Sequence, residues 1–88
     1  MSSILLEQLV LVEPVAVRAW AENRLILIEL HDDRIISFPA RKFSRLKNAT
    51  EDLLAQVRVR AQGSALRWDA LDEDITVEGI MQGFFEED

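Results

Sequence analysis

The distribution of apolar residues predicts a three-stranded antiparallel meander in the first half of the chain. Apolar and polar positions alternate through residues 15–22, which is typical of a strand. Residues 24–31 form the most apolar segment, and residues 34–38 return after a short acidic turn. Pro39 ends the third strand, because proline cannot donate a hydrogen bond to a neighbouring strand.

The central strand of this meander is apolar on both sides. Leu25, Ile26, Leu27 and Ile28 follow one another without a polar interruption. A strand that lacks alternation has both of its faces covered. We expect helices on one face, and either residues 1–13 or a second subunit on the other.

Short helices, a hairpin and a final helix are predicted for the second half. Residues 40–46 read as a basic helical turn, and Thr50 is a good N-cap for a second short helix. Residues 56–61 alternate and, after a turn, pair with residues 65–68 as a hairpin.

The stretch from Asp69 to Asp74 carries four carboxylates in six positions, which favours a solvated loop. Thr76 then suits the N-cap of a last helix, and Gly83 is placed to end it in the left-handed region. The chain is thus predicted to be α+β, with the meander and hairpin in one sheet and short helices on one face. Residues 1–88 form a single domain, with an apolar segment before Pro14 and an acidic tail from Phe84 that frays.

Composition narrows the class of protein. The 88 residues are 49% hydrophobic and 30% charged, values typical of a globular domain, and include no cysteine. This excludes disulfides, thiolate metal sites and a cysteine nucleophile. The apolar run at residues 4–12 is too short to span a bilayer and lacks a basic leader, so we expect a cytoplasmic protein that does not enter membranes.

The net charge of −6 conceals a division along the chain. Residues 34–67 carry eight basic and two acidic residues, whereas residues 69–88 carry eight acidic residues and no basic one. The basic segment either pairs with the acidic tail or binds a polyanion. Pairing is favoured, because the field of a net acidic chain repels nucleic acid.

Two surfaces are candidates for binding. The first is an apolar interface, for which the candidate residues are Trp20, Ile26, Ile28, Leu9 and Leu11. The second is a basic patch that consists of Arg41, Lys42, Arg45, Lys47, Arg58 and Arg60.

The sequence predicts no catalytic, cofactor-binding or metal-binding residue. Asp72, Asp74 and Thr76 have the spacing of a calcium loop, but Val77 replaces the required glycine and Gly83 replaces the closing glutamate. The single histidine, His31, has no nucleophile to activate. We therefore expect a protein that is not an enzyme.

Three blocks of sequence resemble an uncharacterised bacterial family, domain of unknown function 2442. They are RLILIELHDDRIISFP, FSRLKNAT and ALRWDALDEDITVEGI, and the resemblance runs from about Pro14 to Gly83. It implies a small α+β domain with an antiparallel sheet. Some relatives precede a helix-turn-helix domain or lie beside a small partner in what resembles a toxin–antitoxin pair. Where the family commonly has Asp-Gly in the second turn, this chain has Asp32-Asp33, so we expect some strain there.

Two functions of different class remain. The first is a non-enzymatic protein-interaction module that forms a homo-oligomer, most simply a dimer, or binds a small protein partner in the manner of an antitoxin. The second is a nucleic-acid-associated regulatory accessory domain that uses the basic patch.

Overall fold

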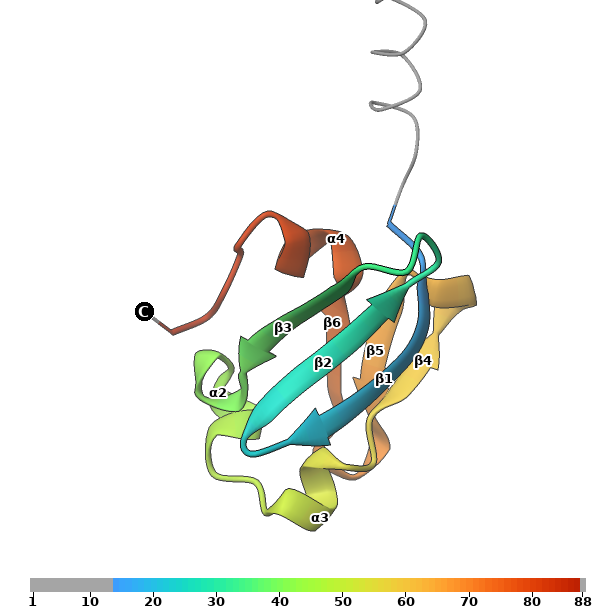
Figure 1. Cartoon of the computed structure of the whole chain (residues 1–88). Helices are drawn as coiled ribbons and strands as arrows, with labels where there is room; N and C mark the ends of the chain where they lie inside the picture. The colour runs from blue at the N-terminus through green and yellow to red at the C-terminus, as the bar shows by residue number, and fades with distance from the viewer. Residues whose placement is uncertain (1–13, 88) are drawn as a thin grey trace, which may run out of the picture.

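The computed structural model describes residues 14–87, which fold into two three-stranded antiparallel sheets with short helices (Figure 1). The first sheet has the order β1-β2-β3 and the second β4-β5-β6. The strands are β1 (Ala16–Glu22), β2 (Leu25–Leu30), β3 (Ile35–Pro39), β4 (Arg58–Arg60), β5 (Ala65–Trp68) and β6 (Glu73–Thr76). The helices are α2 (Ser44–Lys47), α3 (Glu51–Leu54) and α4 (Val77–Met81), and the 3₁₀ turns are η1 (Ala40–Lys42), η2 (Ala61–Gly63) and η3 (Asp69–Leu71).

The predicted meander forms the first sheet. Its first turn contains two residues, Asn23 and Arg24, both with positive φ, as the tightest hairpins require. In the second turn Asp33 has φ 74°, the conformation in which a glycine would be less strained. Asp32 supports this turn by accepting a hydrogen bond from the backbone N–H of Arg34 at 3.1 Å, and this bond lowers the pKa of the Asp32 carboxyl.

The second sheet contains a strand that the sequence analysis missed. The stretch Asp69–Asp74, predicted to be a solvated loop, is a 3₁₀ turn followed by a left-handed residue, Asp72, and the first half of β6. Along β6, Glu73 and Ile75 are buried and the residues between and after them are exposed. The alternation of a strand is present in this stretch, but the charged residue Glu73 occupies one of the positions that face the core. The stretch therefore did not read as a strand with one apolar face.

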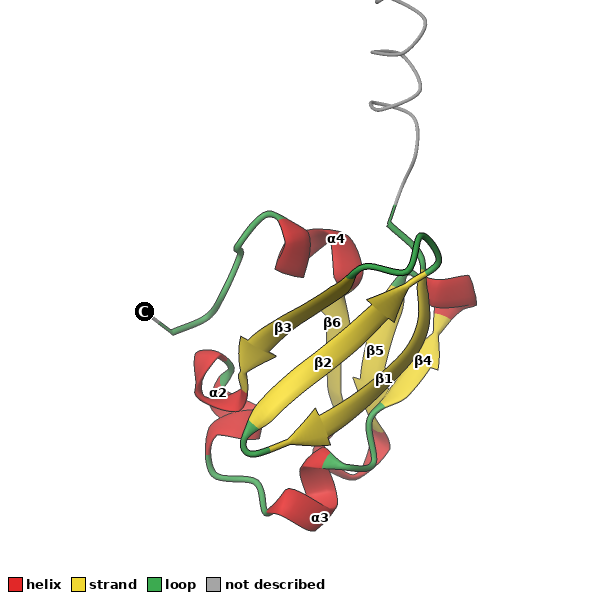
Figure 2. Ribbon diagram, in the orientation of Figure 1, coloured by secondary structure: helices red, strands yellow, loops and turns green. Residues whose placement is uncertain are grey.

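The prediction of a single sheet with helices on one face is wrong. Figure 2 shows the first sheet lying across the second, with the helices at the margins of the pair. The core lies between the sheets, where Ile26, Ile28, Leu66 and Trp68 are all at most 1% exposed. The β4–β5–β6 sheet therefore gives the first sheet the cover that was expected from helices.

Local signals for the helix ends are confirmed. The Oγ1 of Thr50 accepts a hydrogen bond from the N–H of Leu53 at 3.2 Å, and the Oγ1 of Thr76 accepts one from the N–H of Gly79 at 3.0 Å. Gly83 follows the last helix with φ 77°, and its N–H donates to the Ile80 carbonyl. Each of these helix ends is determined by residues that lie within one helical turn of it in the sequence.

Residues 84–87 of the acidic tail, which were expected to fray, make contacts with the rest of the domain. The backbone N–H of Glu87 donates to the carbonyl of Lys42, and Glu86 accepts hydrogen bonds from Ser44. In the part of the chain that the structure describes, no helix has the length and apolar character needed to cross a membrane.

Candidate functional site

The outward-facing side of the first sheet carries several apolar side chains. Strand pairing places Trp20 beside Leu27 and Leu27 beside Ser37, so these three form a row across the middle of the sheet. Leu25 is 38% exposed and Ile35 is 55% exposed on the same side. We call this surface the outer face, and its side chains are Arg18, Trp20, Glu22, Leu25, Leu27, Glu29, Ile35, Ser37 and Pro39.

Charged groups border the aromatic residue of the outer face. The guanidinium carbon of Arg18 lies 4.3 Å from the centroid of the Trp20 ring, a cation–π distance. The Nε of Arg18 also lies 2.5 Å from the Oε1 of Glu29 on the next strand. Glu22 is exposed at the other end of β1. The face is thus apolar at its centre and charged at two of its corners.

Two of the predicted interface residues do not lie on this face. Ile26 and Ile28 are fully buried against the second sheet, so the expectation that they stay exposed is wrong. The sequence could have indicated the correct side of β2. A two-residue turn after Glu22 pairs Trp20 with Leu27, so Leu27 lies on the same face of the sheet as Trp20. Leu25 and Leu27 therefore replace them as interface candidates. The remaining two, Leu9 and Leu11, lie outside the described residues.

Most of the predicted basic patch is engaged within the chain. Arg45 donates to the backbone carbonyl of Asp72 and lies 3.7 Å from its carboxylate. Lys47 lies 3.8 Å from a carboxylate oxygen of the tail, and Arg58 lies 2.8 Å from a carboxylate oxygen of the η3 turn. Lys42 is 5.8 Å above the ring of a tail phenylalanine. Of the six basic residues, Arg41 and Arg60 alone make no ion pair or cation–π contact with the described residues.

A guanidinium that the predicted patch omitted organises the acidic stretch. Arg67 lies 2.7 Å from a carboxylate oxygen of Asp69, 3.1 Å from one of Asp72 and 2.6 Å from one of Asp74. Hydrogen bonds to Asp69 and Asp72 raise the pKa of Arg67 further above its ordinary value. The hydrogen bonds from Arg67 and Arg58 lower the pKa of Asp69. The carboxylates that resembled a calcium loop are therefore neutralised by arginine, and residues 14–87 contain no group of three ligands placed to hold a metal ion.

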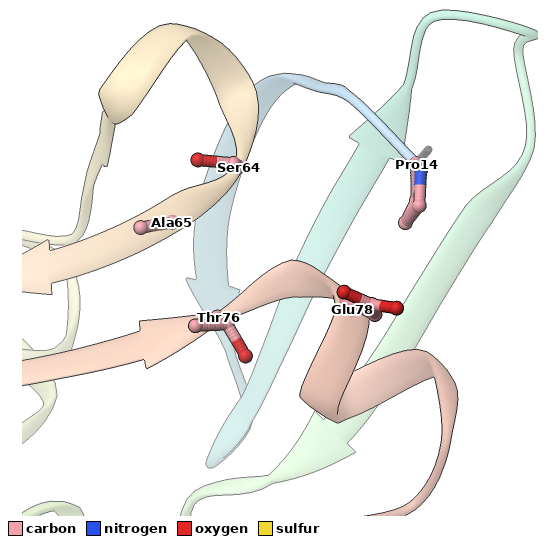
Figure 3. Close-up of a pocket in the computed structure, with 5 residues that line it drawn as sticks. All are labelled: Pro14, Ser64, Ala65, Thr76 and Glu78. Atoms are coloured by element: carbon pink, nitrogen blue, oxygen red, sulfur yellow. The ribbon is translucent and has the colours of Figure 1, made fainter. Parts of the chain in front are cut away.

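A small depression lies where the start of the chain's described part meets α4 (Figure 3). Its volume is about 140 Å³, and it is lined by Pro14, Ser64, Ala65, Thr76 and Glu78. Its polar groups are already engaged. Thr76 caps its helix, Ser64 donates its hydroxyl to the carbonyl of Ala61 at 2.8 Å, and Glu78 accepts from Gln82 at 3.2 Å. No hydroxyl of the lining is paired with a base, so the depression lacks the constellation of a hydrolytic site.

Two solved protein structures are similar in fold to this chain. The chain resembles a crystal structure of a protein of unknown function from Rhodospirillum rubrum, with 32% identity and a TM-score of 0.80 over 84% of this chain and 92% of that one. It also shares its fold with the solution structure of an uncharacterized protein from Chromobacterium violaceum, with 19% identity and a TM-score of 0.71 over 93% of this chain and 75% of that one. No curated protein matches. The model of the family "Protein of unknown function (DUF2442)" matches residues 14–86, and the chain therefore belongs to this family.

Proposed function

We propose that the protein is a non-enzymatic cytoplasmic interaction module that self-associates through the outer face. The observation that carries this proposal is the exposure of Leu25, Ile35 and part of Trp20 on one side of a sheet whose other side packs against the second sheet. No helix or strand of the described residues lies over that side (Figure 2). Apolar surface gathered on one face is typical of a protein–protein interface.

The order of charges along β1 favours a second copy as the partner. Arg18, Trp20 and Glu22 are alternate residues that point outward, so they present a positive, an aromatic and a negative group in a line. A two-fold axis that lies between the two outer faces, above Trp20 and perpendicular to β1, reverses this line in the second copy. Each Arg18 then faces a Glu22, and the two indoles meet at the axis. A two-fold interface requires such self-complementarity.

The size of the outer face sets the strength of the association. Three strands spaced about 4.8 Å apart, each with about five residues of 3.3 Å rise, cover on the order of 240 Å². Burying that area on both copies contributes at most about 12 kcal/mol at 25 cal/mol per Å². Association costs roughly 4–15 kcal/mol, so we expect a weak, concentration-dependent dimer unless residues 1–13 add contact area.

A competing occupant of the outer face is the chain's own residues 1–13, which lie outside the described residues. They include Ile4, Leu5, Leu6 and Leu9, and their removal distinguishes the two arrangements. If the segment covers the face within one chain, the shortened protein aggregates. If a second copy covers it, the shortened protein remains a dimer.

Charge reversal tests the proposed orientation. Glu22→Arg places two arginines opposite each other at both ends of the interface, so the dimer dissociation constant should rise about tenfold, a cost of about 1.4 kcal/mol. The matched control is Asp52→Arg, which makes the same change of charge at an exposed position of α3. Equal weakening by the two substitutions, measured by sedimentation equilibrium, would show that the face does not pair in this way.

The nucleic-acid alternative has less support. Arg45, Lys47 and Arg58 of the basic patch already neutralise carboxylates of the same chain. Binding a phosphate backbone would therefore require these pairs to break. Such exposed pairs are individually weak, typically below about 1 kcal/mol, but an acidic surface close to the ligand remains after they separate.

A further inference from the structure

The C-terminal residues 84–87 lie on the surface of the domain in the manner of a bound peptide. The ring of Phe85 lies 6.3 Å from that of Phe38 and 5.9 Å from that of Phe43, centroid to centroid, the latter edge-to-face. The ammonium of Lys42 lies 5.8 Å from the Phe85 centroid. Aromatic pairs at these separations contribute beyond their buried area. The first residue of the segment that the domain contacts is therefore aromatic, Phe85.

The next two positions are recognised by polar contacts. The Oε1 of Glu86 accepts hydrogen bonds from the backbone N–H of Ser44 at 2.9 Å and from its hydroxyl at 3.1 Å. The backbone N–H of Glu87 donates to the carbonyl of Lys42 at 2.9 Å, and its carboxylate lies 3.8 Å from the Nζ of Lys47. We call the surface that makes these contacts the tail site, and it consists of Phe38, Lys42, Phe43, Ser44 and Lys47.

The segment itself is only partly buried against the tail site. Phe85 remains 37% exposed, and its neighbour Phe84 is 67% exposed. Arg41, next to Lys42 in η1, has no described carboxylate as a partner. The segment is attached through Gly83, which has φ 77° and no atom near the place of a side chain. It is thus a segment attached at the edge of the core, next to Arg41, with which it makes no ion pair among the described residues.

We propose that the tail site binds, in trans, an acidic peptide of a partner protein in which an aromatic residue is followed by glutamate. The partner's peptide replaces Phe85 and Glu86 on the same contacts, and an additional carboxylate reaches Arg41. A second copy of this chain is a poor competitor, because its tail is identical and the tethered tail has an effective concentration in the millimolar range. A partner peptide that also pairs with Arg41 overcomes this advantage.

Peptide titration tests the proposal on the full-length chain. The receptor is the Phe85→Ala/Glu86→Ala variant, which removes the tethered ligand's anchors and leaves the tail site intact. The probe is a synthetic peptide GFFEED with the sequence of residues 83–88, followed by the shift of the Ser44 backbone amide in ¹⁵N-labelled protein. We expect saturable binding, with a dissociation constant at least fivefold lower than for the wild-type chain. The control peptide GFAEED, which lacks the second phenylalanine, should not bind.

A second measurement needs no altered receptor. In the wild-type protein the GFFEED peptide is identical to the tethered tail, so it displaces the tail only at concentrations well above the tail's millimolar effective concentration. At such concentrations it should accelerate hydrogen exchange at the Glu87 amide, whose bond to Lys42 the peptide displaces. The proposal is wrong if a folded receptor variant shows no Ser44 shift at several millimolar peptide. It is equally wrong if GFFEED and GFAEED bind alike, or if peptide well above the tail's effective concentration leaves Glu87 exchange unchanged.

Discussion

A buried carboxylate at the start of β6 predicts a pH dependence of unfolding that a single substitution removes. Glu73 is 8% exposed, and its Oε2 has no hydrogen-bond partner among residues 14–87. Burial raises the pKa of the Glu73 carboxyl, and the nearby carboxylate of Glu86 raises it further, against an opposing effect of Arg45. The adjacent Asp74 points outward and is held by Arg67. The charged form of Glu73 is thus disfavoured in the folded chain.

The sign of the effect follows from linkage. Because the folded pKa lies above the ordinary value of 4.5, the folded state holds a proton that the unfolded state has already released as the pH rises past this value. Stability therefore falls as the pH rises from the unfolded pKa to the folded pKa of Glu73. A buried polar group without a partner typically costs on the order of 1 kcal/mol or more. We expect Glu73→Gln, which cannot ionise, to stabilise the protein at pH 7 by an amount of that order and to have little effect at pH 3.5.

Urea unfolding at the two pH values measures this difference, with the fluorescence of the buried Trp68 as the probe. Asp69 contributes the opposite trend, since its lowered pKa gives stability that is lost as the pH falls, but this contribution is common to wild type and variant and cancels. Asp52→Asn, on the exposed side of α3, is the control for net charge. The reasoning is refuted if Glu73→Gln destabilises the protein at pH 7, or changes its stability equally at both pH values.

The other predictions concern local geometry and charge. Thr76→Ala should cost about 1 kcal/mol because the Gly79 N–H loses its cap, whereas Thr76→Ser should cost less; equal melting temperatures for all three proteins would exclude the cap. Gly63→Ala should destabilise the protein by more than about 2 kcal/mol, because the φ of Gly63 is +91° and a Cβ would lie 2.5 Å from a neighbouring side chain. Gly83→Ala, where a Cβ would meet open space, should cost only about 1 kcal/mol. Urea unfolding of the two variants measures this difference. Duplex and single-stranded DNA should not bind tightly at physiological salt; a submicromolar, salt-dependent affinity in fluorescence anisotropy would favour the nucleic-acid function.

Local features were predictable from the sequence because neighbouring residues decide them. The caps at Thr50 and Thr76 depend on side chains that reach a backbone N–H three residues away. The turn after Glu22 depends on the tolerance of Asn23 for positive φ. The sequence carries less information about which strands pair when they lie far apart in the chain. Nothing in the alternation of single strands indicates that β3 and β4 belong to different sheets, because periodicity identifies strands but not their neighbours across a helical connection.

The candidate binding surfaces were also only partly predictable from local patterns. Trp20 was placed correctly on an apolar face, but its companions were assigned to the wrong side of β2, since a shift of one residue exchanges the two faces of a strand. Phe85 and Glu86 were read as a frayed end because acidic terminal residues usually are exposed. Their contacts with residues about 40 positions earlier depend on the tertiary fold, and no local pattern encodes them.

The mass of the wild-type protein in solution tests the central claim most directly. Light scattering across a range of concentrations should give twice the chain mass of 10.1 kDa at high concentration and approach 10.1 kDa on dilution. Leu27→Glu, which places a charge at the centre of the outer face, should keep the protein monomeric throughout. A wild-type mass of 10.1 kDa at every concentration would contradict self-association through this face.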